Sequence, residues 1–99
     1  MLNIIKNAAD GRTVVSLEGR LDTVTAPELE TAMKDTLTEA ESLTLDFEKL
    51  EYVSSAGLRV ILSIQKAMAE KGGLKVVNVN EIIKEIFDVT GFSEILTIE

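Results

Sequence analysis

The sequence predicts a single α/β domain whose mixed β-sheet, an N-terminal hairpin followed by parallel strands, has helices packed against it. The chain of 99 residues is long enough for one hydrophobic core and too short for two. An Asp10-Gly11 dipeptide between two apolar runs is typical of a hairpin turn. Strand-like and helix-like segments then alternate, and right-handed crossovers between parallel strands place the helices against the sheet. We therefore expect one domain over residues 1–99.

The N-terminal hairpin and the first helix are predicted from residues 2–40. Apolar residues within 2–5 indicate the first strand, and alternating polar and apolar residues over 15–21 indicate the second. Thr25 and Glu28, with Pro27 between them, resemble a capping box, in which the Thr25 hydroxyl accepts a hydrogen bond from a first-turn N–H group. A helix is expected to begin there, and ordinary core packing explains its apolar stripe: Ala26, Leu29, Met33, Leu37 and Ala40.

A third strand and a second helix are predicted in the middle of the chain. Leu43, Leu45 and Phe47 alternate with polar residues, and the pattern changes from strand to helix near Ser54. Polar residues recur in the following helix only on a narrow stripe: Arg59, Ser63, Lys66 and Glu70. We therefore expect most of this helix to be buried.

Glycine and asparagine residues mark the ends of the elements expected in the C-terminal third. Gly72-Gly73 ends the second helix, and the apolar run 74–79 is typical of a central parallel strand. Asn80 is placed to cap a third helix, Gly91 to end it in a left-handed conformation, and Phe92 to fold back onto its last turn. The last apolar residues are expected to form a final strand or edge: Ile95, Leu96 and Ile98.

The charge of the chain limits its partners. Ten Lys and Arg residues against seventeen Asp and Glu residues give a net charge of −7 at neutral pH. Such a field repels phosphate backbones and anionic lipid headgroups, so we expect no nucleic-acid partner. No run approaches the roughly 20 apolar residues of a membrane-spanning helix, and the N-terminus lacks a signal-peptide pattern. The sequence therefore predicts a cytoplasmic protein without membrane insertion.

The absence of Cys and His excludes most small enzymes. The chain has no thiolate nucleophile, no imidazole base and neither of the two commonest transition-metal ligands, so Ser-His-Asp and Cys-His arrangements are impossible. Gly72-Gly73 follows a helix and precedes a strand, the reverse of the order in phosphate-binding loops. No motif calls for a cofactor or a metal.

Paired carboxylates remain as a route to acid–base chemistry. The acids that could crowd one end of the sheet are Asp22, Asp46, Glu48 and Glu51. With seventeen acids in the chain, chance clustering explains them better. A small nucleotide-binding or nucleotide-hydrolysing protein is therefore the alternative of a different class.

The segment from Tyr52 to Leu58, where the third strand gives way to the second helix, is unusual. Either Ser54 or Ser55 can cap the helix, which contributes about 1 kcal/mol. Gly57 in the first turn costs about 0.5 to 1 kcal/mol relative to alanine, so close approach of the backbone should bring a gain there. A phosphate on Ser55 would add about −1.5 to −2 charges at a helix N-terminus that favours anions, and it would block a partner without unfolding the domain.

These features resemble the STAS family, and within it the stand-alone anti-sigma factor antagonists. The resemblance lies in the segment from Tyr52 to Leu62, the loop Gly19-Arg20-Leu21-Asp22, the Gly91-Phe92 stop and the element order. It implies a bacterial partner switch, in which the unphosphorylated antagonist binds an anti-sigma factor serine kinase and frees a sigma factor. Phosphorylation by the kinase ends binding, and a metal-dependent serine phosphatase restores it. The resemblance thus implies a kinase substrate and adaptor, not an enzyme.

Aligning Gly57 and Leu58 with the family motif places Ser55 on the phosphoacceptor, with Ser54 as the second choice. The family often has Asp before the acceptor and Ser or Thr after it, whereas this chain has Ser54 and Ala56. The partner-binding residues that the resemblance implies are Asp22, Ser54, Ser55, Ala56, Gly57 and Arg59.

Three questions remain open, two about single residues and one about the whole domain. Asp22 contacts the partner or only forms a turn, and Arg59 pairs with an acidic partner surface or only belongs to a solvated stripe. The third concerns the whole domain: a scaffold of the same fold in a stress-signalling or lipid-transport complex, in which Ser55 is only a cap.

Overall fold

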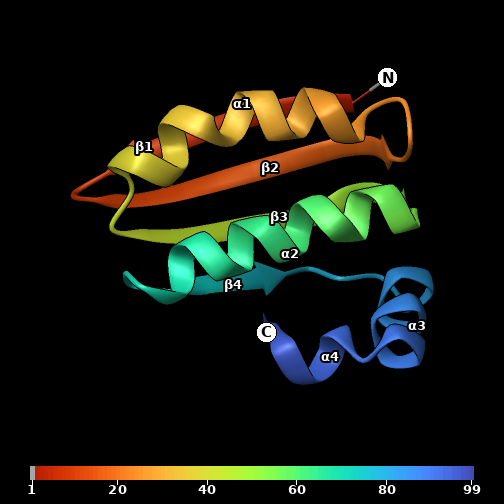
Figure 1. The fold of residues 1–99 in the computed structure, drawn as a ribbon. Helices are drawn as coiled ribbons and strands as arrows, with labels where there is room; N and C mark the ends of the chain where they lie inside the picture. The colour runs from red at the N-terminus through yellow and green to blue at the C-terminus, as the bar shows by residue number, and fades with distance from the viewer. Residues whose placement is uncertain (1) are drawn as a thin grey trace.

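The computed structural model describes residues 2–99 and consists of one five-stranded sheet with helices (Figure 1). The elements in chain order are β1 (Leu2–Ala9), β2 (Arg12–Leu21), α1 (Ala26–Glu39), β3 (Ser42–Val53), α2 (Ser55–Ala69), β4 (Leu74–Val77), α3 (Glu81–Thr90), α4 (Phe92–Ile95) and β5 (Thr97–Ile98). The strands lie in the order β1-β2-β3-β4-β5. The β1–β2 hairpin is antiparallel and the other pairs are parallel, which confirms the predicted mixed sheet.

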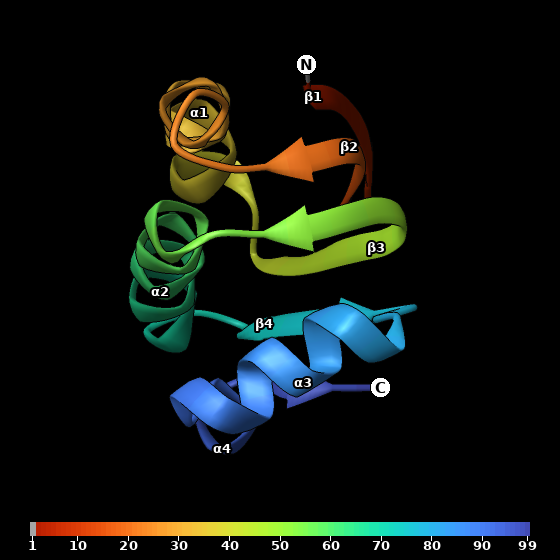
Figure 2. The same ribbon diagram turned by 90° about the vertical axis from the view of Figure 1, so that its right-hand side faces the viewer.

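The helices cover the sheet unevenly. Figure 2 shows α1 and α2 side by side on one face of the sheet. The helix α3 packs against β3 at the end of the sheet beyond the short strand β4 (Figure 1). Among residues 2–99 no helix has the length and apolar character needed to cross a membrane.

The core forms between the sheet and the apolar stripes of the helices, as predicted. Leu29 and Met33 of α1 are fully buried, whereas Leu37 is half-buried at the edge of the core. The helix α2 is largely buried, and its predicted polar stripe is exposed. Buried residues of the central strands complete the same core: Val15, Leu17, Leu43, Leu45 and Phe47.

The strand β3 is longer than the sequence indicated. It pairs with β2 up to Val53, but its register shifts twice, between the pairs Ser16/Asp46 and Glu18/Lys49 and again before the pair Arg20/Tyr52. Each shift inserts an extra residue into β3, which breaks the period of two on which strand prediction depends. The shifts also bring the ends of β2 and β3 level with each other.

The predicted capping box at Thr25 is wrong, although α1 does begin at Ala26. The Thr25 hydroxyl donates to the Arg20 carbonyl at 2.7 Å and accepts from the Asp22 N–H group at 2.8 Å. Thr25 also has helical backbone angles (φ −92°, ψ −18°), unlike a typical N-cap residue. The hydroxyl therefore stabilises the preceding loop instead of the helix end.

The C-terminal predictions are confirmed except in the extents of the last two strands, because β4 ends at Val77 instead of Val79 and Leu96 precedes β5. The Asn80 side chain accepts from the Ile83 N–H group at 2.8 Å, and Gly91 has a left-handed φ of 83°. The Phe92 ring stacks on the Phe87 ring at 6.3 Å between centroids. Ile95 lies in α4, not in a strand, because the left-handed residue lets the chain form one more helical turn before β5.

We expect Phe87→Ala to lower the free energy of unfolding by about 3 to 5 kcal/mol, because this fully buried ring packs between Phe47 and Phe92. Urea unfolding monitored by circular dichroism measures the change. Val89→Ala is the matched control, because Val89 lies on the same helix and is 80% exposed. Equal losses in the two variants would contradict this account of the core.

Candidate functional site

Two segments meet where β2 and β3 end: the serine turn, residues 53–57, and the β2–α1 loop, residues 22–25. Leu21 pairs with Val53 at the last position of the β2–β3 ladder. The Ser54 N–H group then donates to the Leu21 carbonyl at 2.8 Å. Both segments lie at the same end of the sheet, on the right of Figure 1. The structure thus places the two predicted parts of the site next to each other.

The two serines have different roles in this turn. Ser54 is the N-cap of α2, and its Oγ accepts from the Gly57 N–H group at 3.3 Å. Ser55 is the first residue of the helix and is exposed. Among the hydrogen bonds of residues 2–99, none involves the Ser55 hydroxyl. Of the two possible caps, the structure therefore selects Ser54 and leaves the Ser55 hydroxyl directed to solvent.

The close backbone approach expected at Gly57 is present, and its cause is internal packing. A Cβ atom on Gly57 would lie 2.7 Å from Leu21 Cγ and 3.0 Å from the Leu21 carbonyl oxygen. No side chain fits at that separation, so glycine allows the first turn of α2 to pack directly on the end of β2. Gly57 is buried, so it affects the site by setting the position of the first turn of α2 and not by direct contact at the surface.

Asp22 shapes the β2–α1 loop. Its Oδ1 accepts from the Thr25 N–H group at 3.1 Å and from the Val24 N–H group at 3.0 Å. These hydrogen bonds, that of Thr25 first, hold the pKa of Asp22 below its ordinary value, with desolvation opposing them and Arg20 adding to them. The turn-forming role expected of Asp22 is therefore present. The loop leaves Val24, an isolated apolar residue, 77% exposed.

Cationic side chains lie on both sides of the turn. The Arg20 guanidinium lies 4.7 Å from the centroid of the Tyr52 ring, a cation–π contact. Sequence analysis missed this pair because Arg20 and Tyr52 face each other only after the register shifts of β3. Arg59 is exposed, four residues after Ser55 and therefore on the same side of α2. The ion pairs within residues 2–99 join Lys49 to Glu18 and Lys75 to Glu99, and Arg59 is in neither.

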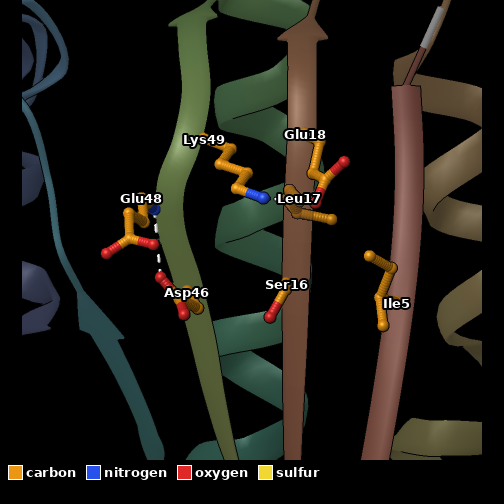
Figure 3. Close-up of a pocket in the computed structure, with 7 residues that line it drawn as sticks. All are labelled: Ile5, Ser16, Leu17, Glu18, Asp46, Glu48 and Lys49. Carbon is orange, nitrogen blue, oxygen red and sulfur yellow. Dashed lines mark hydrogen bonds and ion pairs between the residues drawn. The ribbon is translucent and has the colours of Figure 1, made fainter.

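Asp46 and Glu48, two of the acids considered for acid–base chemistry, lie far from a third, Asp22. Asp46 and Glu48 line a shallow hollow of about 170 Å³ on the open face of the sheet (Figure 3), where Asp46 Oδ1 accepts from the Glu48 N–H group. Asp46 pairs with Ser16 in the β2–β3 ladder. Asp22 lies six residues after Ser16, which corresponds to a separation of roughly 20 Å along a strand. Within residues 2–99 no three acids gather as a metal site would require. None of the five hollows described for these residues is lined by Asp22 or Ser55.

Comparison with known proteins identifies the family to which the chain belongs. The STAS domain profile matches residues 3–99, so the chain belongs to the STAS family. It is 31% identical over 91 residues to the anti-sigma F factor antagonist of Paenibacillus polymyxa, covering 89% of this chain and 78% of that protein. It is 29% identical over 85 residues to the anti-sigma-B factor antagonist of Bacillus subtilis, covering 85% and 78%. The crystal structure of an anti-sigma factor antagonist from Mycobacterium paratuberculosis superposes with a TM-score of 0.90 at 25% identity, covering 99% of this chain and 85% of that one.

We expect the two serines to differ in their contribution to stability. Ser54→Ala removes the cap of α2 and should lower the free energy of unfolding by about 1 kcal/mol. Ser55→Ala removes none of the hydrogen bonds described for residues 2–99 and should change the free energy of unfolding by less than about 0.5 kcal/mol. Urea unfolding of both variants measures this difference, and the reverse order would show that Ser55 is the cap.

The lowered pKa of Asp22 predicts a pH-dependent contribution to stability. Asp22 is more acidic in the folded protein than the ordinary value of 3.8, so its charged form stabilises the fold above that pH. The contribution is lost as the pH falls through the lower, folded pKa. The stability difference between the wild type and Asp22→Asn should therefore shrink on acidification below about pH 4. Urea midpoints measured across this range test it, and a difference that stays constant would contradict it.

Proposed function

We propose that this protein is an anti-sigma factor antagonist of a bacterial partner switch, acting in the cytoplasm. In its unphosphorylated form it binds an anti-sigma factor and thereby frees a sigma factor. The observation that carries the proposal is the exposed Ser55 hydroxyl, free of any capping bond, at the start of α2 beside the β2–α1 loop. The names of the relatives, antagonists of anti-sigma factors, support this class of partner.

Phosphorylation of Ser55 is compatible with the fold. A phosphoserine adds about −1.5 to −2 charges. At the first position of α2, the N–H groups of Ser55 and Ala56 lack intrahelical acceptors, and the positive end of the helix dipole favours an anion. Arg59, one turn further on the same side, adds positive charge. Because Ser54 already caps the helix, the modification breaks no bond of the folded domain.

The same phosphate opposes binding of a partner over the serine turn. A partner that covers Ser55 and the exposed Val24 has to remove water from a dianion, which costs several kcal/mol unless new charges compensate. Phosphorylation therefore ends binding without refolding. In this scheme the anti-sigma factor is itself the serine kinase, a metal-dependent serine phosphatase reverses the modification, and the protein is a substrate and adaptor.

The partner-binding residues divide into those that touch the partner and those that hold the surface in shape. Ser55 and Arg59 are exposed and are placed for direct contact. Gly57 is buried against Leu21, and Ser54 caps the helix. Ala56 and Asp22 are half-buried, and Asp22 also fixes the loop.

We expect Ser55→Ala to bind the anti-sigma factor of the same genome whether or not ATP is present. Ser55→Asp should bind more weakly than the wild type, because its charge faces the partner. Isothermal titration before and after incubation with ATP measures both effects. The matched control is Ser63→Ala, an exposed serine two turns further along α2, which should still dissociate when ATP is added.

Mass mapping of phosphate on the protein isolated from its host identifies the acceptor. Phosphate on Ser54 would keep the switch and move its site by one residue. A Ser55→Ala protein that still dissociates on adding ATP would contradict Ser55 as the acceptor. If phosphate is absent under every growth and stress condition, the constitutive STAS scaffold replaces the proposed switch.

A further inference from the structure

The outward side of α3 carries an apolar stripe of which only Ile86 packs partly against the core. Ile82 is 60% exposed and Val89 is 80% exposed, and Ile86 lies between them at helical spacing. The inner side of the same helix is already buried, through Ile83 and Phe87. A helix with one side in the core needs no second apolar side for folding, so the stripe is available to a partner.

This stripe lines most of a shallow groove, and Tyr52 of β3 borders the groove on the side of the sheet. The groove has a volume of about 440 Å³, and its lining residues are Tyr52, Ile82, Glu85, Ile86, Val89 and Thr90. From Ile82 to Val89 the helix rises about 10 Å, the length of two helical turns. The dimensions fit the apolar side of a short amphipathic helix.

The groove adjoins the candidate site through Tyr52. Tyr52 stands two residues before Ser54 in the chain, roughly 7 Å along an extended backbone. Arg20, which precedes the β2–α1 loop, lies over the same ring. A protein interface of ordinary size covers about 800 Å² per partner, so one partner can span the serine turn and the groove.

The charges beside the groove limit the occupant. A row of acidic residues lies at helical spacing along α3, next to the apolar stripe: Glu81, Glu85 and Asp88. Lys84 is the one basic residue in that helix. An occupant with Lys or Arg flanking its apolar side therefore matches this surface. A second copy of this chain does not match it, because each copy brings a net charge of −7 and the same acidic row.

We propose that this groove binds a basic amphipathic helix of the anti-sigma factor that contacts the serine turn. The inference rests on the proposed function and adds to it. Since Ser55 lies outside the groove, the groove determines which partner binds and the charge on Ser55 determines when it binds.

The test measures binding of the unphosphorylated protein to the purified anti-sigma factor of its own genome. The double variant Ile82→Ser/Val89→Ser should bind about tenfold more weakly or worse, because exposed apolar residues at interface centres carry much of the affinity. Both residues are exposed, so the unfolding midpoint should stay near that of the wild type. The matched control is Ile95→Ser, an apolar residue that is 47% exposed and lies outside the groove, which should bind like the wild type.

Charge reversal tests the occupant's chemistry. Glu85→Lys should weaken binding and reduce its dependence on salt, since an attractive charge pair is replaced by a repulsive one. Glu94→Lys, on α4 outside the groove, is the control of equal charge change.

The outcomes separate this inference from the proposed function. If Ser55→Asp loses binding while the groove variants bind like the wild type, the groove inference is overturned and the switch stands. If the wild type itself does not bind the anti-sigma factor, both are overturned. If the groove variants change only the sedimentation of the protein alone, the occupant is a second copy and the proposal fails.

Discussion

The contact between Gly57 and Leu21 is the constraint on which the candidate site depends. With only a hydrogen atom on Gly57, the first turn of α2 can lie against the end of β2, where any Cβ would be 2.7 Å from Leu21 Cγ. The Leu21 carbonyl accepts from the Ser54 N–H group in the same place. These contacts join the β2–α1 loop to the serine turn, although the two segments are about thirty residues apart in the chain. Packing between a strand end and a helix start thus makes one surface out of two loops.

The division of roles between the adjacent serines follows from that packing. A helix start needs an acceptor for its free N–H groups, and Ser54 supplies it from an extended backbone conformation. Ser55 then enters the helix, and none of the hydrogen bonds described for residues 2–99 involves its hydroxyl. An exposed hydroxyl on which no hydrogen bond of the folded state depends can gain or lose a charged group at little cost to stability. The proposed switch requires that separation of stability from modification.

Much of the fold follows from local patterns, and the errors share one cause. The Asp10-Gly11 turn, the Asn80 cap and the Gly91 stop depend on neighbouring residues only, and each was predicted correctly. Thr25 does not cap α1, because its hydroxyl instead forms hydrogen bonds with the Arg20 carbonyl and the Asp22 N–H group that precede it. The length of β3 was underestimated because its extra residues are defined by pairing with β2.

The sequence by itself determined the element order apart from α4, the burial of the helical stripes and the exclusion of His- and Cys-based chemistry, because composition and periodicity are local properties. It also located the serine turn, through a glycine that is costly in a first helical turn. Only the tertiary structure decided which serine is the cap, that Leu21 is the reason for Gly57, and that Arg20 lies over Tyr52. The apolar groove beside α3 was also visible only in the tertiary structure. The sequence does not show which apolar side of a helix packs in the core and which stays exposed. Contacts between distant segments depend on register and packing, which no local pattern encodes.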